Sequence, residues 1–539
     1  MKVRLGFALA FGAVLAIGAC APATGSDESP PEKELSLRAG DDLQRALDRA
    51  RPGDVITLEA GATFTGPFTL PAKPGDEWIT LRSSDESRLP PAGVRVGPSH
   101  ADPMPKLEAA SDTVIATEPG AHHYRFVGIE IRPRAGTFVY SLVTLGSNET
   151  SSERLPHHIL FERCYLHGDP KRGTRRGIAL NSRETEILDS YFADFKEVGA
   201  DSQAIAGWNG AGPFRIENNY LEGAGENVMF GGADPSIRNL VPADIVIRRN
   251  DFKKPLAWKE GEPTYQGTPW TVKNLLELKN ARRVVVEGNL FDQNWEHAQN
   301  GFAILFTVRN QDGGAPWSVV EDVTFANNVV RHTGSGINIL GRDNSFPSGQ
   351  TRRIAIRNNL FEDVGGGRWG GDGRLFQILD GAANVTIEHN TAFHTGNIIT
   401  AEGQPHIGFV FRDNIVLHND FGIVSAALFP GGDFRRNVIV GGSRFTLPPG
   451  NFFPRSLDKV GFVDYESGQY RLAKSSPYRN AASDGKDVGV DFARLEAARG
   501  QPDKQPSPAP LGSQPDKFSR RADSPLVSTE PLFPVKVGH

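Results

Sequence analysis

The sequence predicts an all-β protein: a single-stranded right-handed parallel β-helix, in which short coils stack on one another. Three observations predict it: a recurring phrase with Asn in a fixed slot, short strands rich in Val, Ile and Phe, and a composition rich in turn residues. The 539 residues include 59 Gly and 38 Pro but only 3 Met. Such a chain contains few long helices, and its length suits a solenoid, whose coils contact only their neighbours.

The recurring phrase reads apolar-x-apolar-x-x-Asn-x-apolar. Earlier copies place Gly128, Cys164 and Ser190 in the Asn slot, and the steps between copies run from 23 to 39 residues. A period in this range with variable insertions is typical of a solenoid of about a dozen irregular coils, and the alternating apolar residues favour strands. The later copies carry Asn219, Asn250, Asn289, Asn328, Asn359, Asn390, Asn414 and Asn437.

Stacking explains why Asn recurs. Successive coils of a β-helix lie one strand spacing apart, about 4.8 Å, so amides in one slot form a ladder along the stack. Asn also tolerates the left-handed backbone of the turn. Cys164 occupies this slot as a small residue, and we interpret it as structural rather than reactive.

The predicted β-helix domain covers residues 38–498. It begins with a short amphipathic helix at residues 41–50, which has acidic residues at its N-terminus. A cap is needed there because the last coil would otherwise expose apolar surface and strand edges. This start, and the closing segment 470–498, resemble the pectin-lyase-like superfamily of right-handed parallel β-helices, which implies the same fold here.

The segments outside the domain indicate export. Residues 1–19 carry Lys2 and Arg4, then an apolar run, and are predicted to be a signal peptide. The sequence IGAC that ends at Cys20 resembles the bacterial lipobox, which implies acylation of that sulfur, a membrane tether and a place in the cell envelope. The alternative is cleavage a few residues later, which releases a soluble secreted protein. Residues 20–37 are predicted to be a flexible tether, and residues 499–539 a disordered Pro-rich tail.

Composition excludes several classes of function. A formal net charge of −5 gives no basic face for nucleic acid. With Cys20 acylated, one cysteine remains and no disulfide framework forms, so we expect a monomer stabilised by its core. The 13 histidines are scattered without metal-ligand spacing, so zinc is not expected. The pair His122–His123 is no exception.

The position of a substrate groove is indicated by loops and tryptophans. The longest insertions fall between Asn250 and Asn328, and five of the seven tryptophans lie in the same middle stretch. Loops from adjacent coils would wall a groove in which flat aromatic rings stack on sugars. The alternative is that these rings pack the loops onto the coils. The five are Trp208, Trp258, Trp270, Trp295 and Trp317.

Strand alternation predicts which side chains floor this groove. In residues 276–280 it presents Glu277 and Lys279 outward, and one coil later it presents Thr307 and Arg309. Two cations beside an acid suit proton abstraction next to a uronate carboxylate and neutralisation of the enolate that forms. The alternative is an exposed ladder of ion pairs.

A Lys followed by Asn280, a Gly-Asn turn at residues 288–289 and an Arg one coil later resemble polysaccharide lyase family six, which includes chondroitinase B and alginate lyases. The resemblance implies that Lys279 is the base and Arg309 the acid, with calcium on the substrate carboxylate. That family holds its calcium with an Asn and two closely spaced Glu residues before the Lys. This sequence has Glu277 there, with Glu226 and Asn227 one coil earlier, which leaves calcium open as a cofactor.

The predicted function is therefore that of an exported enzyme acting on an acidic polysaccharide, and the residues favour a lyase. Around Lys279, Arg309 and Glu277, the substrate-binding candidates are Glu226, Asn227, Asn280 and the five tryptophans. A second hypothesis is a β-helix without catalytic activity that binds glycans or serves in the envelope or in adhesion. A third is a hydrolase or epimerase, for which Asp201, Glu226 and Asp234 would supply the carboxylates.

Overall fold

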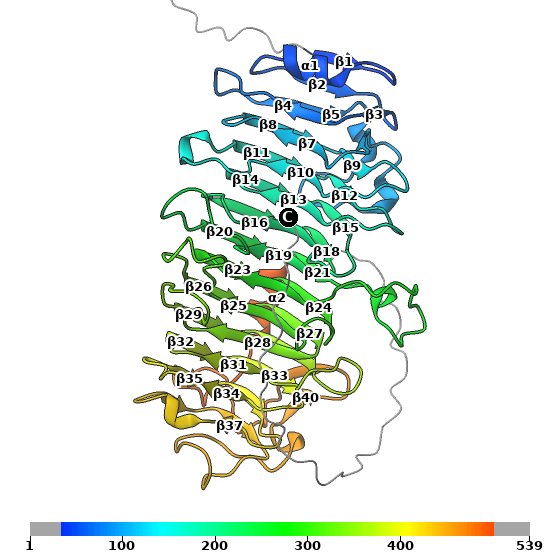
Figure 1. The fold of residues 1–539 in the computed structure, drawn as a ribbon. Helices are drawn as coiled ribbons and strands as arrows, with labels where there is room; N and C mark the ends of the chain where they lie inside the picture. The colour runs from blue at the N-terminus through cyan, green and yellow to red at the C-terminus, as the bar shows by residue number, and fades with distance from the viewer. Residues whose placement is uncertain (1–33, 501–539) are drawn as a thin grey trace, which may run out of the picture. The chain divides into compact units, whose positions relative to one another are not determined.

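The computed structural model describes residues 34–500 and confirms the predicted fold class. The chain winds as a right-handed parallel β-helix through three long parallel sheets, here called A, B and C (Figure 1). Their 14, 13 and 12 strands agree with the predicted dozen coils. The predicted signal peptide, Cys20 and nearly all of the predicted tail lie outside the described residues.

Each sheet takes one strand from each coil. Sheet A comprises β1 (Glu34–Leu37), β2 (Val55–Leu58), β5 (Ile79–Ser83), β8 (His122–Val127), β11 (His157–Glu162), β14 (Arg183–Leu188), β17 (Phe214–Glu217), β20 (Ala243–Arg248), β23 (Ala281–Glu287), β26 (Val320–Ala326), β29 (Arg352–Arg357), β32 (Ala383–Glu388), β35 (Val410–Arg412) and β38 (Asp433–Arg435). Sheet B comprises β3 (Thr63–Thr65), β6 (Lys106–Ala109), β9 (Glu130–Pro133), β12 (Tyr165–His167), β15 (Tyr191–Phe195), β18 (Tyr220–Gly223), β21 (Asp251–Lys253), β24 (Leu290–Asn294), β27 (Val329–Thr333), β30 (Leu360–Val364), β33 (Thr391–His394), β36 (Ile415–Leu417) and β39 (Val438–Val440). Sheet C comprises β4 (Phe68–Leu70), β7 (Thr113–Thr117), β10 (Ser141–Leu145), β13 (Arg176–Leu180), β16 (Gln203–Gly207), β19 (Glu226–Phe230), β22 (Asn274–Leu278), β25 (Phe302–Thr307), β28 (Ser335–Leu340), β31 (Phe376–Leu379), β34 (Ile399–Glu402) and β37 (Ile423–Val424).

The core runs through the stack because alternate side chains of every strand point inward. Leu276 of β22 lies opposite Ile304 of β25, and Leu278 lies opposite Phe306. All four are fully buried. The same columns continue from coil to coil, so the apolar residues form one continuous cluster.

The predicted Asn ladder is confirmed. The backbone N–H and the side-chain amide of Asn289 both donate to Oδ1 of Asn328, at 2.9 and 3.0 Å. The same amide also donates to the carbonyl of Ile247 at 3.0 Å. This pattern holds from Asn219 to Asn437 and extends one step further, to Asn451. The sequence did not indicate that last member because only 14 residues separate it from Asn437.

The first members of the ladder need one correction. Cys164 donates its backbone N–H to Oγ of Ser190 at 3.0 Å, as predicted for one slot. Cys164 is fully buried, and burial raises the pKa of its thiol to about 12, which agrees with a structural role. Phe126 pairs with Phe161, however, so Ile129 rather than Gly128 stands level with Cys164. Gly128 instead occupies the preceding left-handed position, with φ of 64°.

A short helix lies at the predicted N-terminal position, and a strand precedes it. Helix α1 (Leu43–Arg49) starts at Asp42, whose carboxylate accepts the N–H of Arg45, and it buries Leu43 and Leu47 against the first coils. The assignment of residues 34–37 to the flexible tether was wrong. They form β1, which pairs with β2 because alternate leucines pack on the core.

The closing segment folds back over sheet B. After the antiparallel pair β40 (Phe462–Asp464) and β41 (Gln469–Leu472), helix α2 (Phe492–Arg499) contributes Leu495 to a cluster with Val329, Leu360 and Phe393. Three sheet B strands thus gain an apolar cover on their outer face. Within residues 34–500, neither helix has the length and apolar character needed to cross a membrane.

Candidate active site

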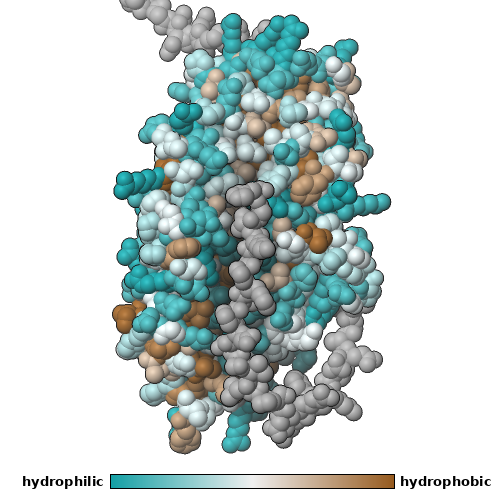
Figure 2. Space-filling view, in the orientation of Figure 1, coloured by the Kyte–Doolittle hydropathy of each residue, from teal (hydrophilic) through white to brown (hydrophobic). Residues whose placement is uncertain are grey.

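The outer face of sheet C carries a row of polar side chains in the middle coils. Arg176, Gln203, Glu226 and Asn274 occupy one register position on β13, β16, β19 and β22. Nε of Arg176 donates to Gln203 at 3.1 Å, and the amide of Gln203 donates to Glu226 at 2.8 Å. Around the sheet C strands of the middle coils, most of the surface visible in Figure 2 is hydrophilic.

The three predicted catalytic side chains come together in this row. Glu277 and Lys279 both point outward, since the two flanking leucines point into the core. The ammonium of Lys279 lies 3.7 Å from Oε1 of Glu277, and the hydroxyl of Thr307 donates to the same oxygen at 3.3 Å. Only 3% of the Glu277 side chain and 15% of the Lys279 side chain is exposed, so the pair lies in a sheltered position rather than on an open face.

Arg309 lies one coil further on, as predicted. Its backbone N–H donates to the carbonyl of Lys279 at 2.9 Å. Its guanidinium is held 3.0 Å from Asp343 and also donates to Asn344, both in the loop after β28. A cavity of about 270 Å³ opens over these groups. Its lining comprises Glu277, Lys279, Gln299, Asn300, Phe302, Leu305, Thr307, Arg309, Asn338 and Gln377.

A second lysine, which the sequence analysis did not single out, enters the same row. Lys273 directly precedes β22, and its ammonium lies 2.5 Å from Asp201 and 3.8 Å from Oε1 of Glu226. Burial opposes its charge, but Glu226 and Asp201 hold the pKa of Lys273 above its ordinary value. Burial raises the pKa of Glu226, with Asp201 adding to the effect. The registers of β16 against β19 and of β19 against β22 bring these three residues together.

The residues that the family resemblance implies for calcium do not converge on a cation site. The side chain of Asn227 is fully buried, where its amide donates to the carbonyls of Leu221 and Lys253. The carboxylate of Glu226 is engaged by Gln203, and the ammonium of Lys273 lies beside it. Calcium needs six to eight oxygen ligands. The oxygens of Glu226 and Asn227 do not fit calcium, because the Lys273 ammonium already lies beside Glu226.

The tryptophans divide into two groups. Trp258, Trp270 and Trp295 are each 4% exposed and form a buried cluster with Trp369. Rings buried to this extent pack the loops onto the coils and offer no face to a sugar, which corrects the expectation for these three. Trp317 donates its indole N–H to the carbonyl of Leu240 at 3.0 Å.

Trp208 differs from the buried tryptophans because it is partly exposed. The Arg176 guanidinium lies 5.0 Å from its ring centroid. Trp208 is therefore the tryptophan that borders the polar row.

The remaining candidates satisfy turns. Asn280 accepts from the N–H of Val319 and donates to the carbonyl of Leu240, so it closes a loop rather than facing the cavity. Asp234 accepts backbone N–H groups from Asp312 and Gly314. Asp201 is paired with the ammonium of Lys273.

Comparisons with known proteins identify the fold. No family model matches the sequence, and no curated protein matches it. Among solved structures, a PL6 family alginate lyase, AlyGC, matches with a TM-score of 0.55 and 15% identity over 88% of this chain and 59% of AlyGC. A mannuronic acid specific polysaccharide family 6 lyase from human gut microbiota matches with a TM-score of 0.54 and 14% identity, over 81% of this chain and 94% of the lyase. The chain thus spans less than two thirds of AlyGC, and the shared feature at these identities is the β-helix fold.

Proposed function

We propose that this protein is a polysaccharide lyase that cleaves a uronate-containing polymer by β-elimination. The observation that carries the proposal is the meeting of Lys279 and Arg309, from successive strands of sheet C, at one cavity beside Glu277. The likeness in fold to a PL6 family alginate lyase and to a mannuronic acid specific polysaccharide family 6 lyase supports the same reaction class. The polar row excludes a purely apolar ligand, and its lysines and arginines suit an acidic chain.

In the proposed reaction, Lys279 acts as the base that takes the proton on the carbon next to the substrate carboxylate. The electrons of that C–H bond form the new carbon–carbon double bond, and the bond to the glycosidic oxygen breaks. Arg309 neutralises and protonates the leaving oxygen, and its two partners in the loop after β28 fix its direction. Preorganised charge of this kind stabilises a developing anion more than mobile water does.

Neighbouring cations bind the polymer on the side of the reacting sugar that faces β13. Lys273 and Arg176 lie further along the row, toward β13. Lys273 contacts Glu226, and Arg176 donates to Gln203. A substrate carboxylate could bind each cation beside that partner. We propose that Lys273 supplies the positive charge near the reacting carboxylate and that elimination needs no calcium ion. Trp208 would pack on a sugar ring at the edge of the row.

The proposal is tested by assaying the full chain on a panel of uronate polymers for the ultraviolet absorbance of the unsaturated product. The variant Lys279→Ala should lose activity by about 10²- to 10⁴-fold, the usual contribution of a positioned acid or base. The matched control is Lys486→Ala, because Lys486 is 68% exposed and lies in the closing segment.

Three outcomes would contradict parts of this proposal. Full activity of Lys279→Ala would remove this residue from the mechanism. New reducing ends without the absorbance would indicate hydrolysis. Binding of a polymer without cleavage would favour the glycan-binding alternative.

We also propose that the chain is exported and held at the cell envelope through Cys20. The support is the leader and the lipobox-like sequence alone. A place in the envelope would bring the cavity to polymers outside the cell.

A further inference from the structure

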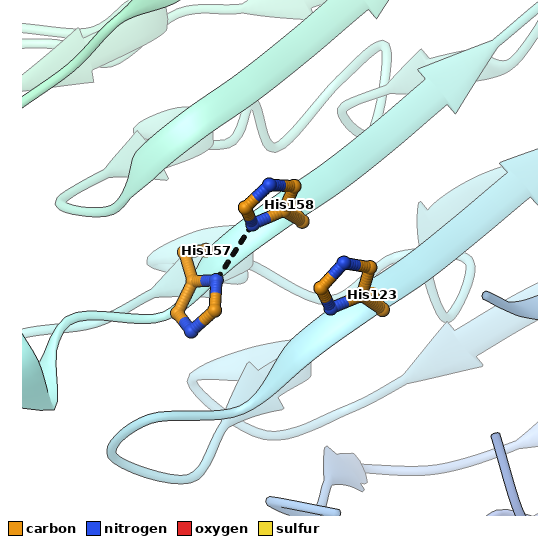
Figure 3. A group of neighbouring side chains, drawn as sticks. All are labelled: His123, His157 and His158. Carbon is orange, nitrogen blue, oxygen red and sulfur yellow. Dashed lines mark hydrogen bonds between the residues drawn. The ribbon is translucent and has the colours of Figure 1, made fainter. Parts of the chain in front are cut away.

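Two pairs of histidines that are 35 residues apart in sequence lie side by side, each at the beginning of a strand of sheet A. His122 and His123 begin β8, and His157 and His158 begin β11, with His122 directly opposite His157. The rings stack in two columns, with centroids 4.7 Å apart for His122 and His157, and 4.3 Å apart for His123 and His158. Figure 3 shows the imidazoles of His123, His157 and His158 gathered at this place.

A local backbone feature brings adjacent residues of one strand together. His123 and His158 have left-handed φ values of 57° and 51°, so the strict alternation of a strand is broken. The Nδ1 atoms within each pair therefore lie only 2.7 Å apart. The next coil repeats the kink at Glu184, with φ of 49°, and Oε2 of Glu184 lies 3.1 Å from Nδ1 of His158.

In coils nearer the C-terminus, the position equivalent to His123 and His158 carries charged residues. There the column holds opposite charges: Arg283 pairs with Asp244 at 2.7 Å, and Arg353 with Asp322 at 2.5 Å. In the upper coils the column instead places one imidazole against another. Two neutral imidazoles that face each other share at most one proton, so ring nitrogens are left over as electron-pair donors.

The distances suit a shared metal ion. The candidate ligand atoms of His123, His157 and His158 all lie within 4.8 Å of one another. A tetrahedral zinc ion with Zn–N bonds of 2.0–2.1 Å needs nitrogens about 3.3 Å apart, which small side-chain rotations supply. Neutral imidazole is the form that binds metal.

We propose that His123, His157 and His158 bind one divalent transition-metal ion of the zinc class, with Glu184 as the fourth ligand. Imidazole suits zinc, copper and nickel, whereas magnesium and calcium prefer oxygen. Arg183 donates to Glu184 at 3.1 Å and orients that carboxylate. The ion would tie β8, β11 and β14 together, on a different sheet from the cavity of Lys279. The site is thus independent of the lyase reaction.

The test uses the full chain, purified without a histidine tag and freed of metal, and titrated with Zn²⁺ in a calorimeter. We expect one equivalent to bind and the midpoint of thermal unfolding to rise. The double variant His123→Gln/His158→Gln should lose that equivalent. The control His418→Gln should keep it, because His418 lies near the opposite end of the β-helix, at the end of β36, where it contacts Asn419.

Cu²⁺ bound to the unmutated chain gives a second readout that does not depend on a variant folding. Its electron paramagnetic resonance spectrum should show coupling to imidazole nitrogens from more than one ring. Failure of the unmutated chain to bind Zn²⁺, equal binding by the folded double variant, or a copper spectrum without nitrogen coupling would each overturn the site. None of these results depends on whether the chain is a lyase.

Discussion

Lys273 shows how one side chain changes the chemistry of the candidate active site. Its ammonium lies beside Glu226, where the family resemblance implies a metal ion, and it is paired with Asp201. A lysine is a compact charge that cannot be removed by a chelator. This placement leads to a prediction that separates the protein from a calcium-dependent lyase.

If the protein has the proposed lyase activity, a chelator should leave the activity of the unmutated protein unchanged, and Lys273→Gln should lower it. Hydrogen bonds to charged groups contribute about 1.5–3 kcal/mol, so kcat/KM should fall about ten- to hundredfold. The measurement is the rate of unsaturated product against substrate concentration, with and without chelator. Lys486→Gln is the control.

Activity that disappears in chelator and returns with calcium would show that Lys273 does not replace the metal. A Lys273→Gln variant that is unchanged in kcat/KM would place the lysine outside the substrate site. Thermal unfolding of the variant separates lost activity from lost structure.

At the scale of the element, the Asn ladder holds the corner between sheets A and B. Each amide in it bonds both neighbouring coils, and the members from Asn219 to Asn437 are almost fully buried. Buried amides of this kind contribute most when every partner is satisfied, and removal of one leaves its neighbours without partners. The ladder thus adds side-chain hydrogen bonds to the strand pairing and core packing that link the coils.

Asn328→Ala should lower the free energy of unfolding by about 2–5 kcal/mol. The change removes the acceptor of two donors from Asn289 and the donor to the carbonyl of Val286, and each unsatisfied buried group costs about 1–3 kcal/mol. Urea denaturation followed by circular dichroism measures the difference. Asn148→Ala, in the loop after β10, is the control. A cost at position 328 no larger than at position 148 would show that the ladder does not stabilise the stack.

At the scale of the molecule, burial of histidine predicts a loss of stability in acid. His394 of β33 is 3% exposed, and burial lowers its pKa from 6.5 to about 4. The unfolded chain therefore binds a proton that the folded chain does not, between pH 6.5 and 4. Stability must fall as the pH falls through this window, by roughly 3 kcal/mol at most for this residue.

The variant His394→Gln should depend less on pH across the same window, whatever its stability at pH 7. Its amide can still donate to the carbonyl of Gly396, as Nδ1 of His394 does. Unfolding midpoints of both proteins at pH 7, 5.5 and 4 give the comparison, with His418→Gln as control. Parallel curves for the two proteins would mean that His394 does not set the acid response.

Much of the fold was predictable because its determinants are local and periodic. Alternating residues such as Leu276 and Leu278 identify a strand face, and the recurring Asn identifies the coil. The outward direction of Glu277 was predictable for the same reason, because it alternates with Leu276 and Leu278 along the strand. The positions of loop side chains were not predictable. Trp258 and Trp270 are buried in a loop, and residue spacing does not distinguish such a tryptophan from one that faces a groove.

The sequence by itself determined the coil repeat, the direction of side chains along each strand and the ladder, because these depend on neighbours a few residues apart or one repeat away. Only the tertiary structure decided which coils share a register. Insertions make the repeat irregular, so the sequence does not predict that Lys273 contacts Glu226 or that His123 contacts His158. Those contacts arise because stacking converts long separations along the chain into one strand spacing. The charged groups of the candidate active site and of the histidine cluster are therefore brought together by the spacing between neighbouring strands.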